Sequence, residues 1–249
     1  MVEEVLRKVV AEVAAGRPVA LCVIVATRGS TPQPVGTMVC VDDAAQMTGT
    51  LGGGCVEADL RRQAHQCLSG HAGRLTTFML DHDFGYDDGM ICGGQMDVAI
   101  AVYSRADETL ALEDALRRMD SGGSAEIPVC ASQETGGVVY RVRVAAAPKL
   151  IIVGGGHIGR ILARMMIAVD FRVTVLDDRA EFANEVRFPP PIVSVQGAIA
   201  ATLGEWAIDA NTYIVIVTRG HKHDEAALRS VIASPVRYLG MIGSRRKIQ

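Results

Sequence analysis

Two cysteines of this 249-residue chain are embedded in glycine. Cys55 follows Gly52-Gly53-Gly54, and Cys92 lies in the stretch Gly89-Met-Ile-Cys-Gly-Gly94. Because glycine has no side chain, a large ligand or another backbone can approach such a sulfur closely. A pair of soft thiolates suits a soft transition metal or sulfur carried as a persulfide. The alternative interpretation is that the glycines serve only turns and that both thiols are buried and take no part in function.

The position of Cys55 favours a reactive thiol. The apolar spacing predicts a helix over 56–68, which places Cys55 at its first turn. A helix N-terminus favours the thiolate and lowers a thiol's pKa, although Glu57 would offset part of this effect. None of the six cysteines forms a CxxC pair, so local spacing predicts no structural zinc site.

A second candidate site follows the apolar strand predicted over 149–153. The residues Gly154-Gly-Gly-His-Ile-Gly159 fit the pattern GxGxxG between a strand and a helix. In such turns Gly154 would permit the tight turn, Gly156 would let the backbone approach a pyrophosphate, and Gly159 would let the helix pack closely on the strand. The N–H groups at the helix start, including that of His157, would then face the anion. The alternative is a degenerate Rossmann fold that binds nothing.

An acidic residue at the end of the next predicted strand strengthens the dinucleotide interpretation. Asp177 and Asp178 follow the strand predicted over 171–176, about 20 residues after the glycines, where an acid would reach a ribose hydroxyl. Of the two, the end of the strand favours Asp177.

Two further loops should lie at the same edge of this sheet. One contains His221 and His223 beside Asp224, which could ligate a metal or relay protons, or could be a polar loop whose aspartate caps a helix. The other contains Arg245 and Arg246, a pair that suits phosphate or carboxylate recognition as well as a solvated helix start.

Composition sets broad limits. A net charge of -3 gives no reason to expect a nucleic-acid partner, and 49% hydrophobic residues are typical of a soluble globular protein. No apolar run approaches the roughly 20 residues that cross a bilayer. The acidic start of the chain does not resemble a secretory signal, so we expect a cytoplasmic protein with free thiols.

The elements that must position these residues form two domains. Residues 1–146 predict a mixed α+β domain that carries the cysteines: helices at 3–15, 56–68 and 108–119, and strands at 18–26, 37–42, 46–51, 74–80 and 96–103. Residues 147–249 alternate strands (149–153, 171–176, 192–196, 212–217, 236–241) with helices (157–169, 198–206, 222–233). Such alternation is typical of a Rossmann-type parallel sheet.

Six segments spread along the chain together resemble the XdhC/CoxI family, the accessory factors that mature xanthine dehydrogenase and related molybdenum hydroxylases. The matching segments are 27–32 (TRGSTP), 49–57 (GTLGGGCVE), 89–94 (GMICGG), 153–159 (VGGGHIG), 220–224 (GHKHD) and 240–247 (GMIGSRRK). Members of that family usually continue beyond the last segment, so this chain resembles a shortened version or a piece of one.

The resemblance implies a protein that binds the molybdenum cofactor, as molybdopterin or its dinucleotide form, supports its sulfuration and delivers it to the apo-hydroxylase. Cys55 and Cys92 would then lie near the metal or the incoming sulfur, with Gly53 and Gly54 at the same site. A cysteine desulfurase would be a partner, and the chain would form a homodimer. The sequence also allows an NAD(P)-dependent oxidoreductase with His221 or His223 as acid/base, or a nucleotide-binding protein without turnover.

Overall fold

The protein is described by a computed structural model for residues 1–80, 93–131, 137–219 and 221–243, with the backbone alone at 221–223. The chain divides into two compact units, Met1–Ala146 and Ala147–Gln249. Each unit has its own hydrophobic clusters, and each is described by itself below.

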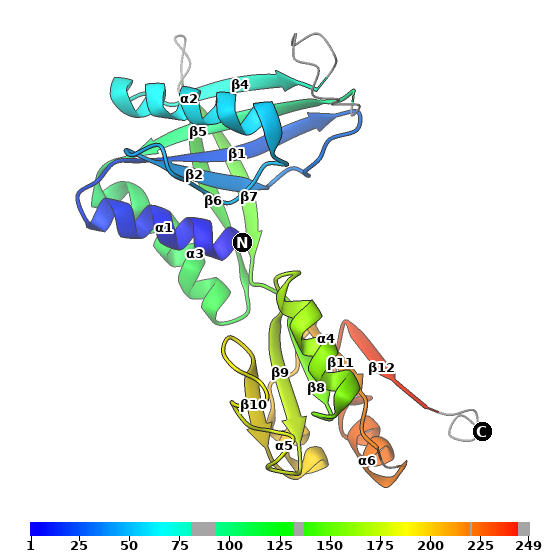
Figure 1. The fold of residues 1–249 in the computed structure, drawn as a ribbon. Helices are drawn as coiled ribbons and strands as arrows, with labels where there is room; N and C mark the ends of the chain where they lie inside the picture. Colours follow the sequence, from blue (N-terminus) through cyan, green and yellow to red (C-terminus); the bar gives the residue numbers. More distant parts are fainter. Residues whose placement is uncertain (81–92, 132–136, 220, 244–249) are drawn as a thin grey trace. The chain divides into compact units, whose positions relative to one another are not determined.

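The first unit is built on a five-stranded antiparallel sheet (Figure 1). Its strands are β1 (Val19–Arg28), β2 (Met38–Asp42), β3 (Met47–Thr48), β4 (Arg74–Met79) and β5 (Gln95–Tyr103), in the spatial order β3-β2-β1-β5-β4. The central strand β1 is fully buried from Val19 to Ile24. It reads as a continuous apolar run because both faces of the sheet are covered.

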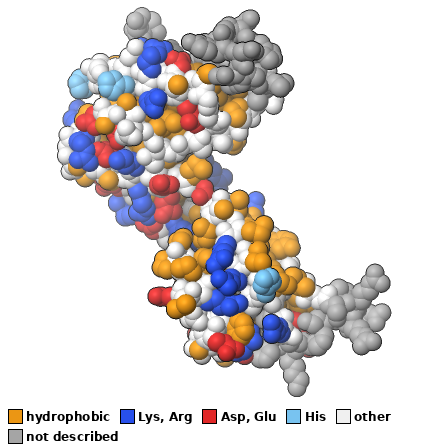
Figure 2. All heavy atoms as spheres, viewed as in Figure 1, with side chains coloured by type: hydrophobic (Ala, Val, Ile, Leu, Met, Phe, Trp, Pro, Cys, Tyr) orange, Lys and Arg blue, Asp and Glu red, His pale blue; other side chains and the backbone are white. Residues whose placement is uncertain are grey.

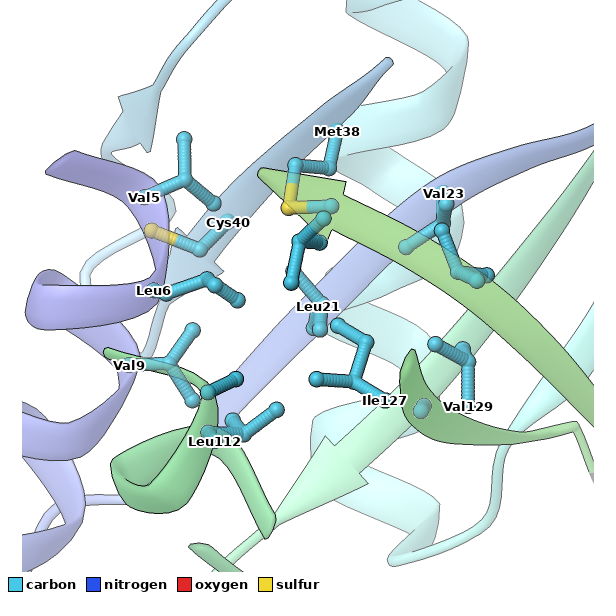
Figure 3. Close-up of a cluster of buried hydrophobic side chains, with 14 of the residues drawn as sticks. Val5, Leu6, Val9, Leu21, Val23, Met38, Cys40, Leu112, Ile127 and Val129 are labelled. Carbon is cyan, nitrogen blue, oxygen red and sulfur yellow. The ribbon is translucent and has the colours of Figure 1, made fainter. Parts of the chain in front are cut away.

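Helices cover both faces of this sheet. Helix α2 (Gly54–Gly70) packs on one face, whereas α1 (Val2–Ala14), η2 (Ala106–Thr109) and α3 (Leu110–Asp120) lie on the other with the hairpin β6 (Ser124–Ala131)–β7 (Val138–Ala145). Because side chains alternate along a strand, Leu21 points to the α1 side and Cys22 to the α2 side. Figure 3 shows Leu21 and Val23 of β1 in the hydrophobic core on the α1 side of the sheet, with residues of α1, β2, α3 and β6 around them.

The second unit is a five-stranded sheet in which every neighbouring pair is parallel. Its strands are β8 (Lys149–Val153), β9 (Arg172–Asp177), β10 (Val193–Gln196), β11 (Thr212–Ile216) and β12 (Tyr238–Met241), in the order β10-β9-β8-β11-β12. The strand order reverses between β8 and β11, which is the position where open α/β sheets bind ligands.

Helices also lie on both faces of the parallel sheet. Helix α4 (His157–Ile167) and the segment after β9, including Phe188, cover one face. Helices α5 (Ile199–Glu205) and α6 (His221–Val231) cover the other. The expected Rossmann-type parallel sheet and the expected mixed α+β fold of the N-terminal unit are both confirmed. The structure adds that the N-terminal sheet is antiparallel. The strand predicted over 46–51 is shorter, because only Met47 and Thr48 pair with β2.

Candidate functional site

The glycine-rich turn connects β8 to α4 at the carboxyl end of the parallel sheet. A Cβ on Gly155 would overlap the carbonyl oxygen of Phe182, and one on Gly159 would overlap that of Gly154. These two positions therefore tolerate only glycine, because backbone packs directly on them. Gly156 differs, since a Cβ there would meet nothing within 4 Å. The open space that a phosphate group needs lies beside Gly156, at the start of α4.

The first residues of α4 are exposed to solvent. His157 and Arg160 are exposed, as is Arg164 one turn further along the helix. Figure 2 shows Lys and Arg side chains beside hydrophobic ones on the face of this unit that carries α4. A helix N-terminus with basic neighbours is a favourable place for an anion.

Asp177 lies at the end of β9, as predicted, but it is only 2% exposed. Its carboxylate accepts hydrogen bonds from the backbone N–H of Gly155 at 2.8 Å and from that of Arg179 at 3.0 Å. The Arg179 guanidinium adds two more, through Nε at 2.9 Å and Nη2 at 3.0 Å. Burial alone would raise the pKa of Asp177, but these hydrogen bonds outweigh it and lower the pKa. Its role toward a ribose stays a prediction.

Two arginines and an aromatic ring lie over the same turn. The Arg179 guanidinium stacks on Phe182, 3.8 Å from the ring centroid, and the Arg187 guanidinium lies 5.0 Å from that centroid. Arg187 Nε donates to the carbonyl oxygen of Gly155 at 2.7 Å. Neither arginine was singled out from the sequence. The signal available was an aromatic residue between two arginines shortly after the acid of a GxGxxG unit.

The loop after β11 follows a second strand end at the carboxyl edge of the parallel sheet. Asp224 is 2% exposed and accepts a hydrogen bond from the Thr218 hydroxyl at 2.5 Å, so this aspartate ties the start of α6 to the strand end. The side chains of His221 and His223 lie outside the described residues, as do Arg245 and Arg246. Their proposed metal, proton-relay and phosphate roles stay predictions.

In the first unit, Cys55 is half-buried and lies in the first turn of α2, as the sequence predicts. The preceding loop folds around the carboxylate of Glu57. Glu57 Oε1 accepts hydrogen bonds from the Thr50 hydroxyl at 2.6 Å and from the backbone N–H groups of Leu51 and Gly53, each at 2.9 Å. Burial raises the pKa of Glu57, but these hydrogen bonds outweigh it, so the pKa is lowered. The carboxylate thus holds the shape of the loop that carries Cys55.

Three sequence motifs meet at this end of the antiparallel sheet. A Cβ on Gly52 would lie 2.6 Å from the Pro32 side chain, so the glycine loop rests on the segment after β1. That segment also contacts the start of β5, because Ser30 forms a β-bridge with Gly93 and leaves no room for a side chain on Gly94. The segments 27–32, 49–57 and 93–94 are therefore in one contact chain.

Cys92 lies outside the described residues, so its proposed role stays a prediction. The residues that sequence reasoning missed here are Glu57 as the acceptor that organises the loop and Pro32 as its support. Among the described residues, no group of three His, Cys, Asp or Glu side chains could hold a metal ion. No helix within the described ranges has the length and apolar character to cross a bilayer.

Comparison with known proteins matches both units. A protein-family model described as "XdhC Rossmann domain" matches residues 150–249, and a second family model, described as "XdhC and CoxI family", matches residues 12–79. The chain is 26% identical over 233 residues to the uncharacterized protein YqeB of Escherichia coli (strain K12), covering 93% of this chain and 35% of YqeB. It thus spans about a third of that relative.

A second relative by sequence and a solved structure are also similar to the chain. The chain is 21% identical over 267 residues to a probable xanthine dehydrogenase subunit of Bacillus subtilis (strain 168), covering 91% of this chain and 80% of that protein. A crystal structure described as a xanthine dehydrogenase from Bacillus halodurans superposes with a TM-score of 0.83 at 19% identity, covering 99% of this chain and 83% of the other, and shows the shared fold. With family models matched in each of its two units, the chain belongs to the XdhC/CoxI family.

Proposed function

We propose that this protein is an accessory factor of a xanthine dehydrogenase-type molybdenum hydroxylase. It binds the molybdenum cofactor, supports its sulfuration and delivers it to the apoenzyme. Support comes from the family membership and from the name of the Bacillus subtilis relative, a probable xanthine dehydrogenase subunit. The observation that carries the proposal is the contact chain of the first unit, which presents a half-buried thiol in a glycine loop shaped by Glu57.

Each unit, taken by itself, carries residues that suit one part of such a cofactor. The cofactor supplies a soft molybdenum centre on a pterin that carries phosphate. A half-buried thiol among glycines suits the metal end, because sulfur is a soft ligand and glycine leaves space for a bulky group. The open space at Gly156 and the basic start of α4 suit phosphate.

The chain's own residues would bind and orient the cofactor in this scheme. Glu57 holds the Cys55 loop, and Cys55 would contact the metal end of the cofactor. The role that the family resemblance implies for Cys92 stays a prediction, because Cys92 lies outside the described residues. A cysteine desulfurase would supply the sulfur, and the family resemblance adds a homodimer to the proposal. The protein's role is to hold and hand over the cofactor, with no turnover of a small substrate.

Co-expression with the enzymes of cofactor synthesis tests this function. We expect the purified chain to carry about one molybdenum and one pterin per binding site, measured by elemental analysis and pterin fluorescence. In Cys55→Ala both should fall at least tenfold. The matched control is Cys130→Ala, which removes an exposed cysteine of β6 in the same unit and should change neither.

The same preparations should restore activity to a separately purified apo-hydroxylase. Light scattering should report a homodimer. Retention of molybdenum and pterin in Cys55→Ala would contradict the assignment of the site. Pterin-free protein that oxidises NADH or NADPH with a small substrate would instead support the oxidoreductase alternative, which the glycine-rich turn also allows.

A further inference from the structure

We propose that Arg179 and Arg187 form a phosphate-monoester site beside the glycine-rich turn of the second unit. The ligand held there would end in a phosphate monoester in place of the free ribose diol that the acid at the end of the next strand commonly binds. This inference deepens the proposed function and rests on it only for the identity of the cofactor, because the phosphate chemistry comes from the arginines themselves.

The first observation is that Asp177 has no capacity left for a ribose. An ionised carboxylate offers about four acceptor sites. Gly155 and Arg179 donate hydrogen bonds to both oxygens, and the side chain is 2% exposed. A ribose diol could reach this carboxylate only by displacing Arg179, which would leave the buried charge of Asp177 without its partner.

The second observation is that Arg187 has donors to spare. Its Nε is used by the carbonyl oxygen of Gly155, and no carboxylate pairs with it among the residues that the structure describes. The terminal amino groups of its guanidinium therefore lie beside the turn without an acidic partner in the described chain. A guanidinium fork of this kind matches the oxygens of a phosphate.

The third observation is that both cations are pre-positioned. Phe182 lies under both guanidinium groups, and each arginine is tied to Gly155, Arg179 through Asp177 and Arg187 directly. Little side-chain entropy would be lost when a ligand binds, because the hydrogen bonds and the ring already restrict both side chains.

Charge then favours a monoester over a diester. Asp177 neutralises Arg179, and Asp178 lies 3.8 Å from the same guanidinium, so the surplus positive charge belongs to Arg187 and to the helix start at Gly156. A phosphate monoester carries roughly two negative charges and three acceptor oxygens, whereas a diester carries one charge. The stronger anion gains more at this position.

Two ligands share this chemistry. One is the terminal phosphate of a pterin cofactor, and the other is the 2′-phosphate of a dinucleotide. The experiment separates them by using NADP+ and NAD+ as titrants on the full chain, and by measuring the pterin that co-purifies from cells making the molybdenum cofactor.

Titration calorimetry with NADP+ and NAD+ provides the first arm. We expect NADP+ to bind at least tenfold more tightly than NAD+, and Arg187→Gln to abolish that difference. Arg187→Lys keeps the charge but loses the fork, so it should retain part of the preference. The matched control is Arg229→Gln, an exposed and ion-paired arginine of α6. Thermal unfolding of every variant verifies that the fold is kept.

The second arm uses the co-purified pterin. If neither dinucleotide binds but Arg187→Gln lowers pterin content at least tenfold, with Arg229→Gln unchanged, the phosphate is that of the pterin. Asp178→Asn should strengthen binding two- to fivefold in whichever arm responds, because it removes a competing acid near Arg179. This sign distinguishes a phosphate site from a structural role of the arginines.

The proposal is overturned if NAD+ binds as tightly as NADP+, if the preference survives in Arg187→Gln, or if neither dinucleotide binds and the pterin content does not depend on Arg187. A chain that shows the NADP+ preference but carries no pterin would contradict the cofactor-chaperone function and leave the phosphate site standing. A chain that loses its pterin in Cys55→Ala, and that also gives one of the three results that overturn the phosphate site, would support the cofactor-chaperone function and contradict the phosphate site.

Discussion

Glu57 shows how one carboxylate can organise a functional loop. It lies in the first turn of α2, where a negative charge also interacts favourably with the helix dipole. Its hydrogen bonds hold Thr50, Leu51 and Gly53 in place, and Cys55 follows directly. The residue that the sequence presents only as a charge opposing the thiolate is thus the acceptor on which the loop is built.

Removing this acceptor should loosen the loop. In Glu57→Ala the donors lose a charged partner, and we expect about 2 kcal/mol less stability in urea unfolding at pH 7. Glu57→Gln should fall between the two proteins. Since the pKa of Glu57 is lowered in the folded state, its contribution is present above the ordinary value of 4.5 and is lost as the pH falls through the folded value. The control is Glu126→Gln, because Glu126 is an exposed residue of β6. Equal losses of stability in Glu57→Ala and Glu126→Gln would contradict the assignment.

The glycine-rich turn allows a comparison of one substitution at two positions. Gly159→Ala should cost about 3 kcal/mol or prevent folding of the second unit, because its Cβ would overlap backbone that cannot move away. Gly156→Ala should change stability by less than about 1 kcal/mol, since its Cβ meets open space. We expect it instead to weaken binding of a phosphate ligand tenfold or more. Thermal unfolding and calorimetric titration measure the two effects, and unimpaired binding in Gly156→Ala would show that the ligand lies elsewhere.

At the scale of elements, a buried acid near the end of helix α1 joins the helix to the segment that follows it. Glu12 is 5% exposed and receives hydrogen bonds from Arg17, beyond the helix end, and from Lys8 one turn earlier. The hydrogen bond from Arg17, followed by that from Lys8, lowers the pKa of Glu12 to about 2. The acid therefore stays ionised through the pH range in which ordinary glutamates are protonated.

This low pKa predicts a pH dependence of stability. The contribution of Glu12 is fully present above its ordinary pKa of 4.5 and is lost as the pH falls toward about 2. Glu12→Gln should therefore flatten the loss of stability between pH 5 and pH 3, followed by urea unfolding. Glu4→Gln, exposed on the same helix, should keep the slope of the unchanged protein. An unchanged slope in Glu12→Gln would show that the ion pairs do not persist in solution.

The secondary structure was largely predictable from local patterns. Alternation of short apolar strands with amphipathic helices predicted the parallel sheet after Pro148, and the extents of β8, α4 and β9 differ from expectation by two residues or fewer. β3 was the exception. Its predicted extent depended on pairing with a neighbour, and pairing ends where the chain turns toward Gly52 and its contact with Pro32.

At the scale of the whole molecule, separate cores predict separate unfolding. Leu60 is buried under the antiparallel sheet and Ile152 lies within the parallel one. We expect calorimetry to resolve two unfolding transitions. Leu60→Ala should lower the free energy of unfolding of the first unit by about 3 kcal/mol, and Ile152→Ala that of the second by a similar amount. Inorganic phosphate should raise only the transition that Ile152→Ala lowers. A single transition shifted by either substitution would contradict independent cores.

The sequence by itself determined the element types, the position of the glycine-rich turn and the place of Cys55 at a helix start, because these follow from residues close together along the chain. Only the tertiary structure decided the partners. Asp177 is saturated by Gly155 and Arg179, Arg187 reaches Gly155 from 32 residues away, and Gly52 rests on Pro32. Such contacts depend on how distant segments pack, since any of several nearby donors could satisfy a carboxylate and only close packing selects one.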